Sequence, residues 1–303
     1  MTEPQLAGLQ DADLPALIAE LGIPGLFDVH VHFMPPQILA KVWAYFDSAG
    51  PLLGRAWPIR YRGTDDERIA QLRAMGVKKF SSLAYAHKPG IAGFMNDWNR
   101  EFAARTPDTL WSATFYPEPE AAAYVPALIA EGVEIFKAHL QVGNFAADDP
   151  YLEPVWGVLA ESGTPIVLHA GSGPAPGRHT GPSGVAEVLA RHPQLKLIIA
   201  HLGMPEFTEF LDLADRYASV RLDTTMAFVD FWGDPVPDGM PARLRHLQDR
   251  ILLGTDFPNI PYAYAHQVEV LQRLDLGDDW MRDVLWRNGS TLFDVTVPDA
   301  DAP

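Results

Sequence analysis

The sequence predicts a single (β/α)8 barrel. Eight short apolar segments recur along the chain, and amphipathic segments separate most of them. Apolar strands separated by helices imply a parallel sheet covered on both faces, and eight such units close most simply into a barrel. The length of 303 residues suits one α/β barrel domain. A doubly wound open sheet is the structural alternative, but no glycine fingerprint opens a helix after an early strand, so nucleotide binding lacks support.

The first predicted strand, residues 26–33, is short, apolar and rich in β-branched residues. Side chains alternate along a strand, so His30 and His32 point to the same face. Two imidazoles on one face can bind one metal ion, although both could instead be solvated or hydrogen-bonded core histidines. The preceding residues 1–25 are polar and proline-punctuated, and we assign them to an N-terminal extension with a short helix at 14–21.

The remaining elements follow in alternation. After the first strand, a helical pattern runs through Phe46, and residues 47–64 form a loop rich in Gly and Pro. The later predicted strands are residues 77–85, 110–116, 133–140, 165–169, 195–201, 220–223 and 251–254. The later predicted helices are residues 65–75, 92–105, 121–131, 152–162, 185–191, 206–217, 262–274 and 280–293. We assign residues 26–295 to the barrel and expect residues 296–303 to be a disordered tail.

The composition excludes several functional classes. A formal net charge of -16 argues against nucleic acid or an anionic membrane as a partner, because both need a basic surface. The chain has no cysteine, so any metal ion must be held by His, Asp or Glu. The first residues lack the basic region and apolar run of a signal peptide, and no apolar run reaches the length of about 18 residues that a membrane helix needs. We therefore expect a cytoplasmic enzyme with a small-molecule substrate.

Three further metal-binding side chains stand at the ends of predicted strands. His169 ends one strand, His201 ends the next, and Asp256 follows two residues after the last. The C-terminal ends of barrel strands converge on one face, where barrel enzymes keep their chemistry. A buried carboxylate without a partner is very costly, and a metal ion would be that partner. The pattern therefore predicts one divalent metal site at the C-terminal face.

Several motifs carry a resemblance to a known family. They are Phe27-Asp-Val-His30-Val-His32, Val167-Leu-His169, Ile199-Ala-His201-Leu-Gly203, Leu252-Leu-Gly-Thr-Asp256-Phe-Pro258 and Asn288-Gly-Ser-Thr-Leu-Phe293. In this order they resemble the amidohydrolase superfamily, and more narrowly the branch that includes aminocarboxymuconate semialdehyde decarboxylase. The family's closing motif usually has alanine after the asparagine, where Gly289 stands here.

The resemblance implies a ligand set and a catalytic group. His30, His32, His169 and Asp256 would hold one divalent ion, with zinc as the first choice and manganese as an alternative; three nitrogens, one oxygen and an open position suit a catalytic site. His201 would be the general acid/base, with Asp256 also counted among the catalytic residues. A second metal in this superfamily usually needs a carboxylated lysine on the fourth strand. Lys137 and His139 share a face of that strand, so they could line the pocket or bridge a second ion, or Lys137 could pair with a carboxylate.

Other pocket candidates come from the loops that follow the strands, since loops on this face hold specificity residues. They are Arg55, His87, Arg178 and His179, although each could be an ordinary solvated side chain. A rival family with a His-x-His start, the distorted-barrel phosphoesterases, needs more acidic ligands and a basic phosphate-binding cluster.

The predicted reaction is metal-dependent hydrolysis of a lactone, amide or ester. The alternative is non-oxidative decarboxylation of an aromatic or unsaturated acid, in which arginine forks would suit the recognition of the carboxylate. A non-catalytic metal-binding protein is the third possibility, and it would gain nothing from an open coordination position. The resemblance also implies a homodimer.

Overall fold

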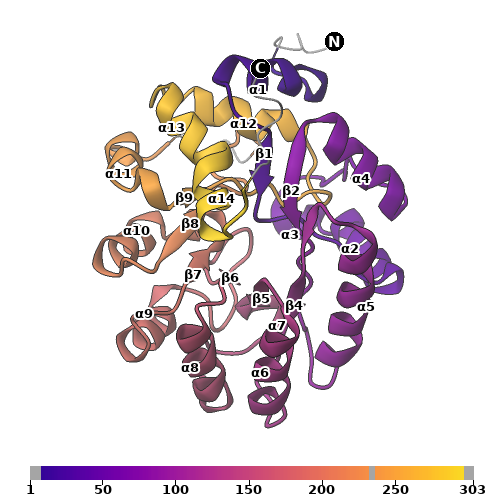
Figure 1. Cartoon of the computed structure of the whole chain (residues 1–303), viewed down its shortest axis with the longest axis vertical. Helices are drawn as coiled ribbons and strands as arrows, with labels where there is room; N and C mark the ends of the chain where they lie inside the picture. Colours follow the sequence, from indigo (N-terminus) through magenta and orange to yellow (C-terminus); the bar gives the residue numbers. More distant parts are fainter. Residues whose placement is uncertain (1–7, 232–235, 297–303) are drawn as a thin grey trace.

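Nine short parallel strands form the centre of the computed structural model, which describes residues 8–231 and 236–296 (Figure 1). The strands are β1 Leu26–Asp28, β2 Val77–Ser81, β3 Thr109–Leu110, β4 Ser112–Thr114, β5 Ile135–His139, β6 Ile166–His169, β7 Leu197–Ile199, β8 Arg221–Asp223 and β9 Ile251–Leu252. Their hydrogen-bonded orders are β1-β2-β3 and β4-β5-β6-β7-β8-β9, and every pairing is parallel.

Backbone contacts join the two sheets into a barrel. β3 and β4 belong to one extended segment interrupted only at Trp111. At the other seam, the backbone N–H of Val29 donates to Leu253 O at 2.9 Å, and Val31 forms a parallel bridge with Phe257. The first and last strands therefore lie side by side, and the predicted (β/α)8 barrel is confirmed.

Helices surround the strands on the outside (Figure 1). They are α1 Leu14–Leu21, α2 Pro36–Ser48, α3 Gly50–Leu53, α4 Asp65–Ala74, α5 Ala92–Arg105, α6 Ala121–Glu131, α7 Leu140–Gly143, α8 Glu153–Ser162, α9 Pro182–Arg191, α10 Phe207–Arg216, α11 Met240–His246, α12 Tyr264–Gln272, α13 Asp278–Arg282 and α14 Asn288–Leu292, with a π-helical turn Asp283–Arg287 before the last. Short 3-10 turns span Asp11–Asp13, Pro150–Leu152, Ala200–Gly203 and Gln248–Arg250.

The helix before the barrel buries one face. Leu14, Leu17, Ile18 and Leu21 of α1 are buried, at the spacing of successive helical turns. Arg282 of α13 donates from its Nε to Leu21 O at 2.7 Å, which ties this helix to the last helices of the chain. Helix α1, within the extension predicted for residues 1–25, is therefore packed against the last helices of the chain.

The structure differs from the sequence-based prediction at several boundaries. The first strand ends at Asp28, so both histidines follow the strand, and Val31 between them forms an isolated bridge. The third predicted strand is split at Trp111. The predicted loop 47–64 contains α3, and the short helices α7 and α11 were not predicted. The tail predicted to be disordered lies outside the described residues, apart from residue 296.

The closing motif has a packing reason for its glycine. A Cβ atom on Gly289 would lie 2.7 Å from Cγ of Phe27, so the ring of the first strand occupies the space that an alanine methyl group would need. Asn288 donates from Nδ2 to Gln248 O at 2.7 Å and to Ile251 O at 2.8 Å. The last helix is thereby fastened to both the start and the end of the barrel.

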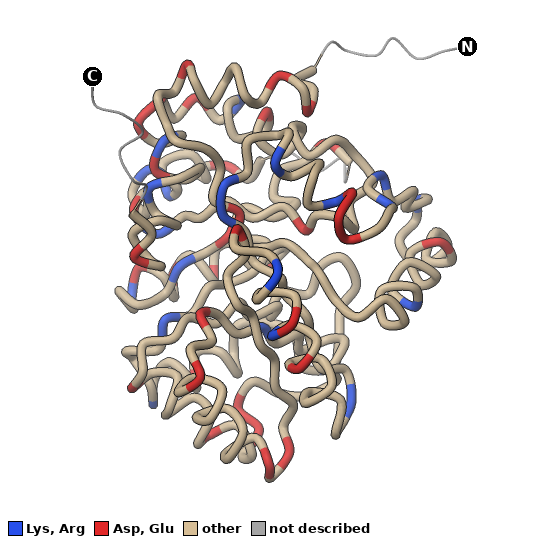
Figure 2. The backbone as a smooth tube through the Cα atoms, turned by 45° about the vertical axis from the view of Figure 1, so that its right-hand side comes forward, with Lys and Arg blue, Asp and Glu red and all other residues tan. Residues whose placement is uncertain are grey.

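Charged residues are spread over the outer helices and loops, where acidic positions outnumber basic ones (Figure 2). Most arginines on this surface form ion pairs with nearby carboxylates, such as Arg243 with Asp215 at 2.6 Å. In the part of the chain that is described, we find no helix with the length and apolar character required to span a bilayer.

Candidate metal centre

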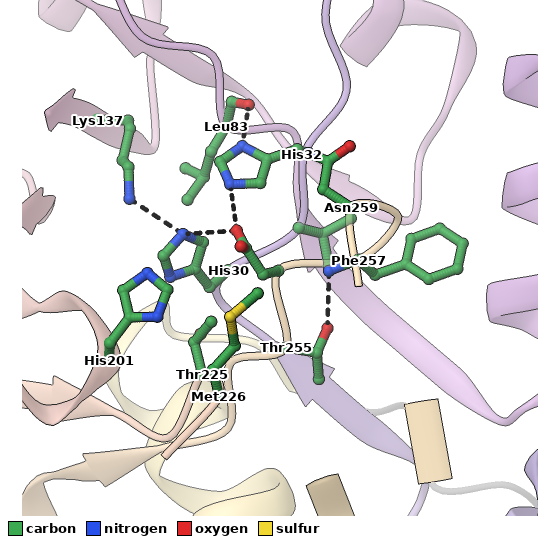
Figure 3. A network of polar contacts seen from close by, with 12 residues as sticks. His30, His32, Leu83, Lys137, His201, Thr225, Met226, Thr255, Phe257 and Asn259 are labelled. Carbon is green, nitrogen blue, oxygen red and sulfur yellow. Dashed lines mark hydrogen bonds and ion pairs between the residues drawn. The ribbon is translucent and has the colours of Figure 1, made fainter. Parts of the chain in front are cut away.

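Three side chains from opposite ends of the chain meet at the C-terminal face of the barrel. The nearest ligand atoms of His30, His32 and Asp256 all lie within 4.8 Å of one another. Oδ1 of Asp256 is 2.6 Å from Nε2 of His32 and 3.5 Å from Nε2 of His30 (Figure 3). The two histidines reach one place from the segment that follows β1.

The second ring nitrogen of each histidine has its own partner. Nδ1 of His30 lies 2.9 Å from Oδ2 of Asp223, and Nδ1 of His32 lies 2.9 Å from Leu83 O. A carbonyl or carboxylate oxygen only accepts, so each of these two contacts places a proton on Nδ1, and Nε2 of His30 keeps its lone pair. Nε2 of His32 lies 2.6 Å from Oδ1 of Asp256, so a bound metal ion would take the place of a proton between these two atoms. Burial lowers the pKa of His30 to about 4, which favours the neutral ring that metal binding requires.

The backbone around Asp256 is shaped to bring the carboxylate close to His30. A Cβ on Gly254 would lie 2.4 Å from Thr225 Oγ1 and 2.9 Å from His30 Cβ, so only glycine allows this approach. Asp256 itself has a left-handed φ of 65°, and its N–H donates to His30 O at 2.8 Å. Burial raises the pKa of Asp256, but the neighbouring His32 and His30 outweigh that effect and hold the pKa below its usual value.

The buried carboxylate of Asp28 supports the segment that carries Asp256. Asp28 accepts from the His30 N–H at 3.0 Å, from Thr255 Oγ1 at 2.5 Å and from the Tyr264 hydroxyl at 2.9 Å. Burial raises the pKa of Asp28 to about 7, and these three hydrogen bonds oppose the rise. Asp28 therefore links the two segments that carry the group of three ligand atoms.

Lys137 reaches the same place from β5. It is 0% exposed, and its Nζ lies 3.0 Å from Nε2 of His30 (Figure 3). Burial lowers its pKa to about 8, against the attraction of Asp223 and Asp256. The nearest partner of Lys137 is thus a ligand histidine, and not a carboxylate as one reading of the sequence allowed.

His201 follows β7 in an unusual backbone conformation. His201, Leu202 and Gly203 all have left-handed φ angles, of 58°, 51° and 77°. The His201 N–H donates to Oδ1 of Asp223 at 2.9 Å, and its ring lies 5.1 Å from that of His30, centre to centre. Its Nδ1 is buried and has no hydrogen-bond partner within the described residues. Burial lowers its pKa to about 4, so the ring is neutral and able to accept a proton.

The remaining predicted ligand, His169, lies beside His30, His32 and Asp256, but its ring faces a backbone carbonyl. Its Nε2 is 2.9 Å from Gly173 O, and its ring stacks on that of His139 at 3.9 Å between centres. The ring of His201 is 4.7 Å away. Burial lowers the pKa of both His139 and His169. His169 is therefore adjacent to the group of three ligand atoms, and its role as a fourth ligand stays a prediction.

These side chains lie in the wall of a cavity of about 470 Å³. The cavity is also lined by His87, Lys137 and His139, as the sequence suggested. Arg55, Arg178 and His179 are not among its lining residues: the guanidinium of Arg55 is exposed and lies 4.8 Å from the ring centre of Phe231, Arg178 is exposed and His179 is half-buried. Their assignment as substrate contacts has no support in this geometry.

The residues present fit a divalent metal ion. Two imidazole nitrogens and one carboxylate oxygen converge, and the unpartnered Nδ1 of His201 belongs to a ring whose centre lies 5.1 Å from that of His30. Each ring is oriented by an outer hydrogen bond, as is usual for histidine ligands. The donor set contains nitrogen and oxygen atoms alone, which suits zinc or manganese.

A family model described as amidohydrolase matches residues 27–295, which cover nearly the whole described barrel. The chain belongs to the amidohydrolase family. Metal-dependent hydrolysis and decarboxylation both fit this family, so both reactions that the sequence predicted are compatible with it. The similarity to the amidohydrolase superfamily inferred from the motifs is confirmed.

Solved structures of amidohydrolase-like proteins share the fold at low sequence identity. An uncharacterised TIM-barrel protein from Bordetella bronchiseptica has a TM-score of 0.70 and 19% identity, over 89% of this chain and 99% of that one. A 5-carboxyvanillate decarboxylase from Novosphingobium aromaticivorans, complexed with manganese and a nitrobenzoic acid, has a TM-score of 0.61 and 14% identity, over 91% and 97%. A probable 2-pyrone-4,6-dicarboxylic acid hydrolase from Acinetobacter baumannii gives 0.59 and 14%, over 89% and 100%. Comparison with curated protein sequences found no match.

Sequence reasoning missed one important residue of this amidohydrolase site. Asp223 is 0% exposed and binds both the His30 ring and the His201 backbone. Burial raises its pKa, but the nearby His30 outweighs this and keeps the pKa below its usual value. Asp223 ends the strand predicted at residues 220–223, so the rule that identified the other strand-end residues could have found it.

Proposed function

We propose that this amidohydrolase is a metal-dependent hydrolase of an apolar ester, lactone or amide. The observation that carries the proposal is the position of the His30, His32 and Asp256 group in the wall of a largely apolar cavity. None of the described lining residues is an arginine, and the guanidinium forks that suit carboxylate recognition are therefore missing from the described lining. A substrate with a neutral reacting carbonyl fits this pocket better than a polycarboxylate.

A metal ion at this group would polarise the carbonyl and activate the attacking water. The chain's own residues would do the rest. His201, neutral and buried beside His30, takes the proton from the water and returns it to the leaving group. Lys137 donates to the oxygen on which negative charge develops, from its buried position in the middle of β5. Asp223 holds the ring of His30 and the backbone of His201 in place.

We propose one zinc ion, with manganese as the alternative. The support is the nitrogen and oxygen donor set and the manganese in the related decarboxylase structure. His169 would complete the set by turning its ring away from Gly173 O. The homodimer, the cytoplasmic location and the absence of a nucleic-acid partner stay predictions.

One observation favours decarboxylation as a second candidate. Lys137 is a fully buried cation within 3.0 Å of a ligand histidine, so it could hold a substrate carboxylate beside the metal. In that reaction His201 would deliver the proton to carbon. The two reactions differ in what leaves: hydrolysis incorporates an oxygen atom from water, and decarboxylation releases carbon dioxide.

The test is a substrate screen on purified protein, loaded separately with zinc and with manganese. Lactones, aryl esters, amides and aromatic acids would be scored by proton release, by carbon dioxide release and by incorporation of ¹⁸O from labelled water. We expect ¹⁸O in the product of an apolar ester, lactone or amide. Activity should disappear after treatment with a chelator and return when the metal is restored. Carbon dioxide release without ¹⁸O incorporation would replace the hydrolase proposal by the carboxy-lyase.

A further inference from the structure

One helix face contributes much of the cavity's apolar lining. Ile38, Val42, Tyr45 and Phe46 of α2 line the cavity, and Leu53 of α3 adds to them. The α2 positions are spaced as i, i+4, i+7 and i+8, which places them on one side of a helix. We call residues 36–53, which comprise α2 and α3, the cap. Its pocket side is a continuous apolar stripe that follows directly from helical periodicity.

A single cation borders that stripe. Lys41 also lines the cavity, at position i+3 from Ile38, and lies at one edge of the apolar face, where it is exposed. No ion pair within the described residues involves Lys41. A lysine needed only for solubility would serve equally well on the opposite face of α2, where Asp47 already pairs with Arg62. The placement of Lys41 thus calls for an explanation at the pocket.

A second polar group accompanies this cation. His87, from the loop after β2, lines the same cavity. Burial lowers the pKa of His87, and the nearby charges of Lys88 and Lys41 lower it further, so its ring is a neutral hydrogen-bond donor next to a positive charge. Asp256 is the only acidic residue among the described residues that line the cavity. In a chain with a net charge of -16, the pocket is therefore locally basic.

We propose that Lys41, assisted by His87, forms a binding subsite for one anionic group on the substrate, separate from the metal centre. This proposal rests on the proposed hydrolase function and deepens it. The substrate class becomes an ester, lactone or amide with an apolar body and a single carboxylate remote from the scissile carbonyl. The carbonyl lies at His30, His32 and Asp256, the apolar body lies against the cap, and the carboxylate meets the ammonium group of Lys41.

The test uses two matched series of phenyl esters on the zinc-loaded enzyme. In one series the acyl chain ends in a carboxylate, and in the other it ends in a carboxamide of the same length. A hydrogen bond between two charged groups is stronger than one to a neutral amide, so at the best chain length we expect kcat/KM to be about 10-fold higher for the carboxylate, mainly through KM. Lys41→Met should remove this preference, and Lys41→Arg should retain most of it.

Lys88→Met is the matched control. Lys88 is exposed, neighbours His87 in sequence and does not line the cavity, so its loss removes an equal charge near the subsite while Lys41 and His87 both remain. The preference should survive in Lys88→Met. If Lys41→Met and Lys88→Met reduce the carboxylate preference equally, the preference arises from the general positive potential of the region, and the subsite does not exist.

Binding of a non-reactive pair separates failure of this proposal from failure of the hydrolase function. Calorimetric titration with an ω-phenylalkanoate and with its carboxamide needs no turnover. Tighter binding of the carboxylate that depends on Lys41 supports the subsite even if no ester is hydrolysed. Tighter binding that persists in Lys41→Met and disappears when zinc is removed would place the carboxylate on the metal and overturn the proposal. Ester hydrolysis with no carboxylate preference overturns the subsite and leaves the hydrolase function intact.

Discussion

The metal centre and the cap face the same cavity but are built by different physical means. At the metal centre, His30 and His32 are buried, and each is oriented by a hydrogen bond to an outer partner. The cap presents apolar side chains at helical spacing, and two indole hydrogen bonds to Asn259 tie it and the segment after it to the barrel. The chemistry thus depends on a few defined geometries, whereas substrate binding depends on contact area. Substitutions at the two regions should therefore fail in different ways.

The largest effect is expected at a metal ligand. Asp256→Asn removes the negative charge that the two histidines face, so the protein should lose most of its metal. Without the metal, several kcal/mol of transition-state stabilisation disappear, and turnover should fall by at least about 10³-fold. Metal content by elemental analysis and turnover would be measured on the same preparations. Full metal retention in Asp256→Asn would place the ion elsewhere.

His169→Asn tests the fourth ligand in the same assay. In the structure its Nε2 faces Gly173 O, so the ring must rotate for the nitrogen to reach a metal ion. If it does, the variant should lose metal affinity as Asp256→Asn does. A variant that keeps its metal and loses only substrate affinity would make His169 a pocket residue, alongside the stacked His139.

The next effect separates catalysis from metal binding. His201→Asn removes the proposed acid/base and leaves His30, His32 and Asp256 untouched. The variant should keep its metal and melting temperature, while turnover falls by about 10²–10⁴-fold. Metal retention in this variant, and metal loss in Asp256→Asn, would separate the two roles. If His201→Asn is metal-free while His169→Asn stays loaded, the roles assigned to these two histidines are reversed.

The same contrast explains how much could be predicted from the sequence. Strand-end residues such as His30, His201 and Asp256 were found because parallel strands deliver their C-terminal ends to one face, whatever the loops do. The cap was predicted as a helix followed by a loop, and nothing in the sequence showed that it would line the pocket. Arg55 was chosen from its residue type and its place in a loop, and the structure places its guanidinium 4.8 Å from the ring centre of Phe231. Contacts of an irregular segment depend on packing that periodicity does not encode.

Asp223 offers a test of intermediate size. Asp223→Asn keeps the shape of the side chain but removes the charge that orients His30 and the backbone of His201. Loss of an outer partner of a metal ligand typically costs about 10–100-fold in metal affinity. We expect Asp223→Asn to lower the metal affinity by about this factor, as measured by competition with a chromophoric chelator. Activity should recover at saturating metal. An unchanged affinity would show that Asp223 serves the backbone of His201 alone.

The smallest effect probes the joint between the two regions. Asn259 Oδ1 accepts from Trp43 Nε1 of α2 at 3.0 Å, while the Asn259 N–H donates to Asp256 O at 2.8 Å. Asn259→Leu removes only the first bond, because the backbone is unchanged. An unsatisfied indole N–H costs about 1–3 kcal/mol when buried, and Trp43 is half-buried, so the free energy of unfolding should fall by about 1 kcal/mol.

Kinetic constants would then show whether the cap or the metal centre is altered. A loosened cap should raise KM for apolar esters a few-fold and leave kcat and metal content unaltered. Trp43→Phe removes the other partner of the same bond, so the double variant should be little worse than either single variant. If kcat falls and metal is lost with KM unchanged, the cap and the metal centre are one cooperative unit, joined through Asn259. Catalysis at the metal centre and substrate binding at the cap would then not be independent at this residue.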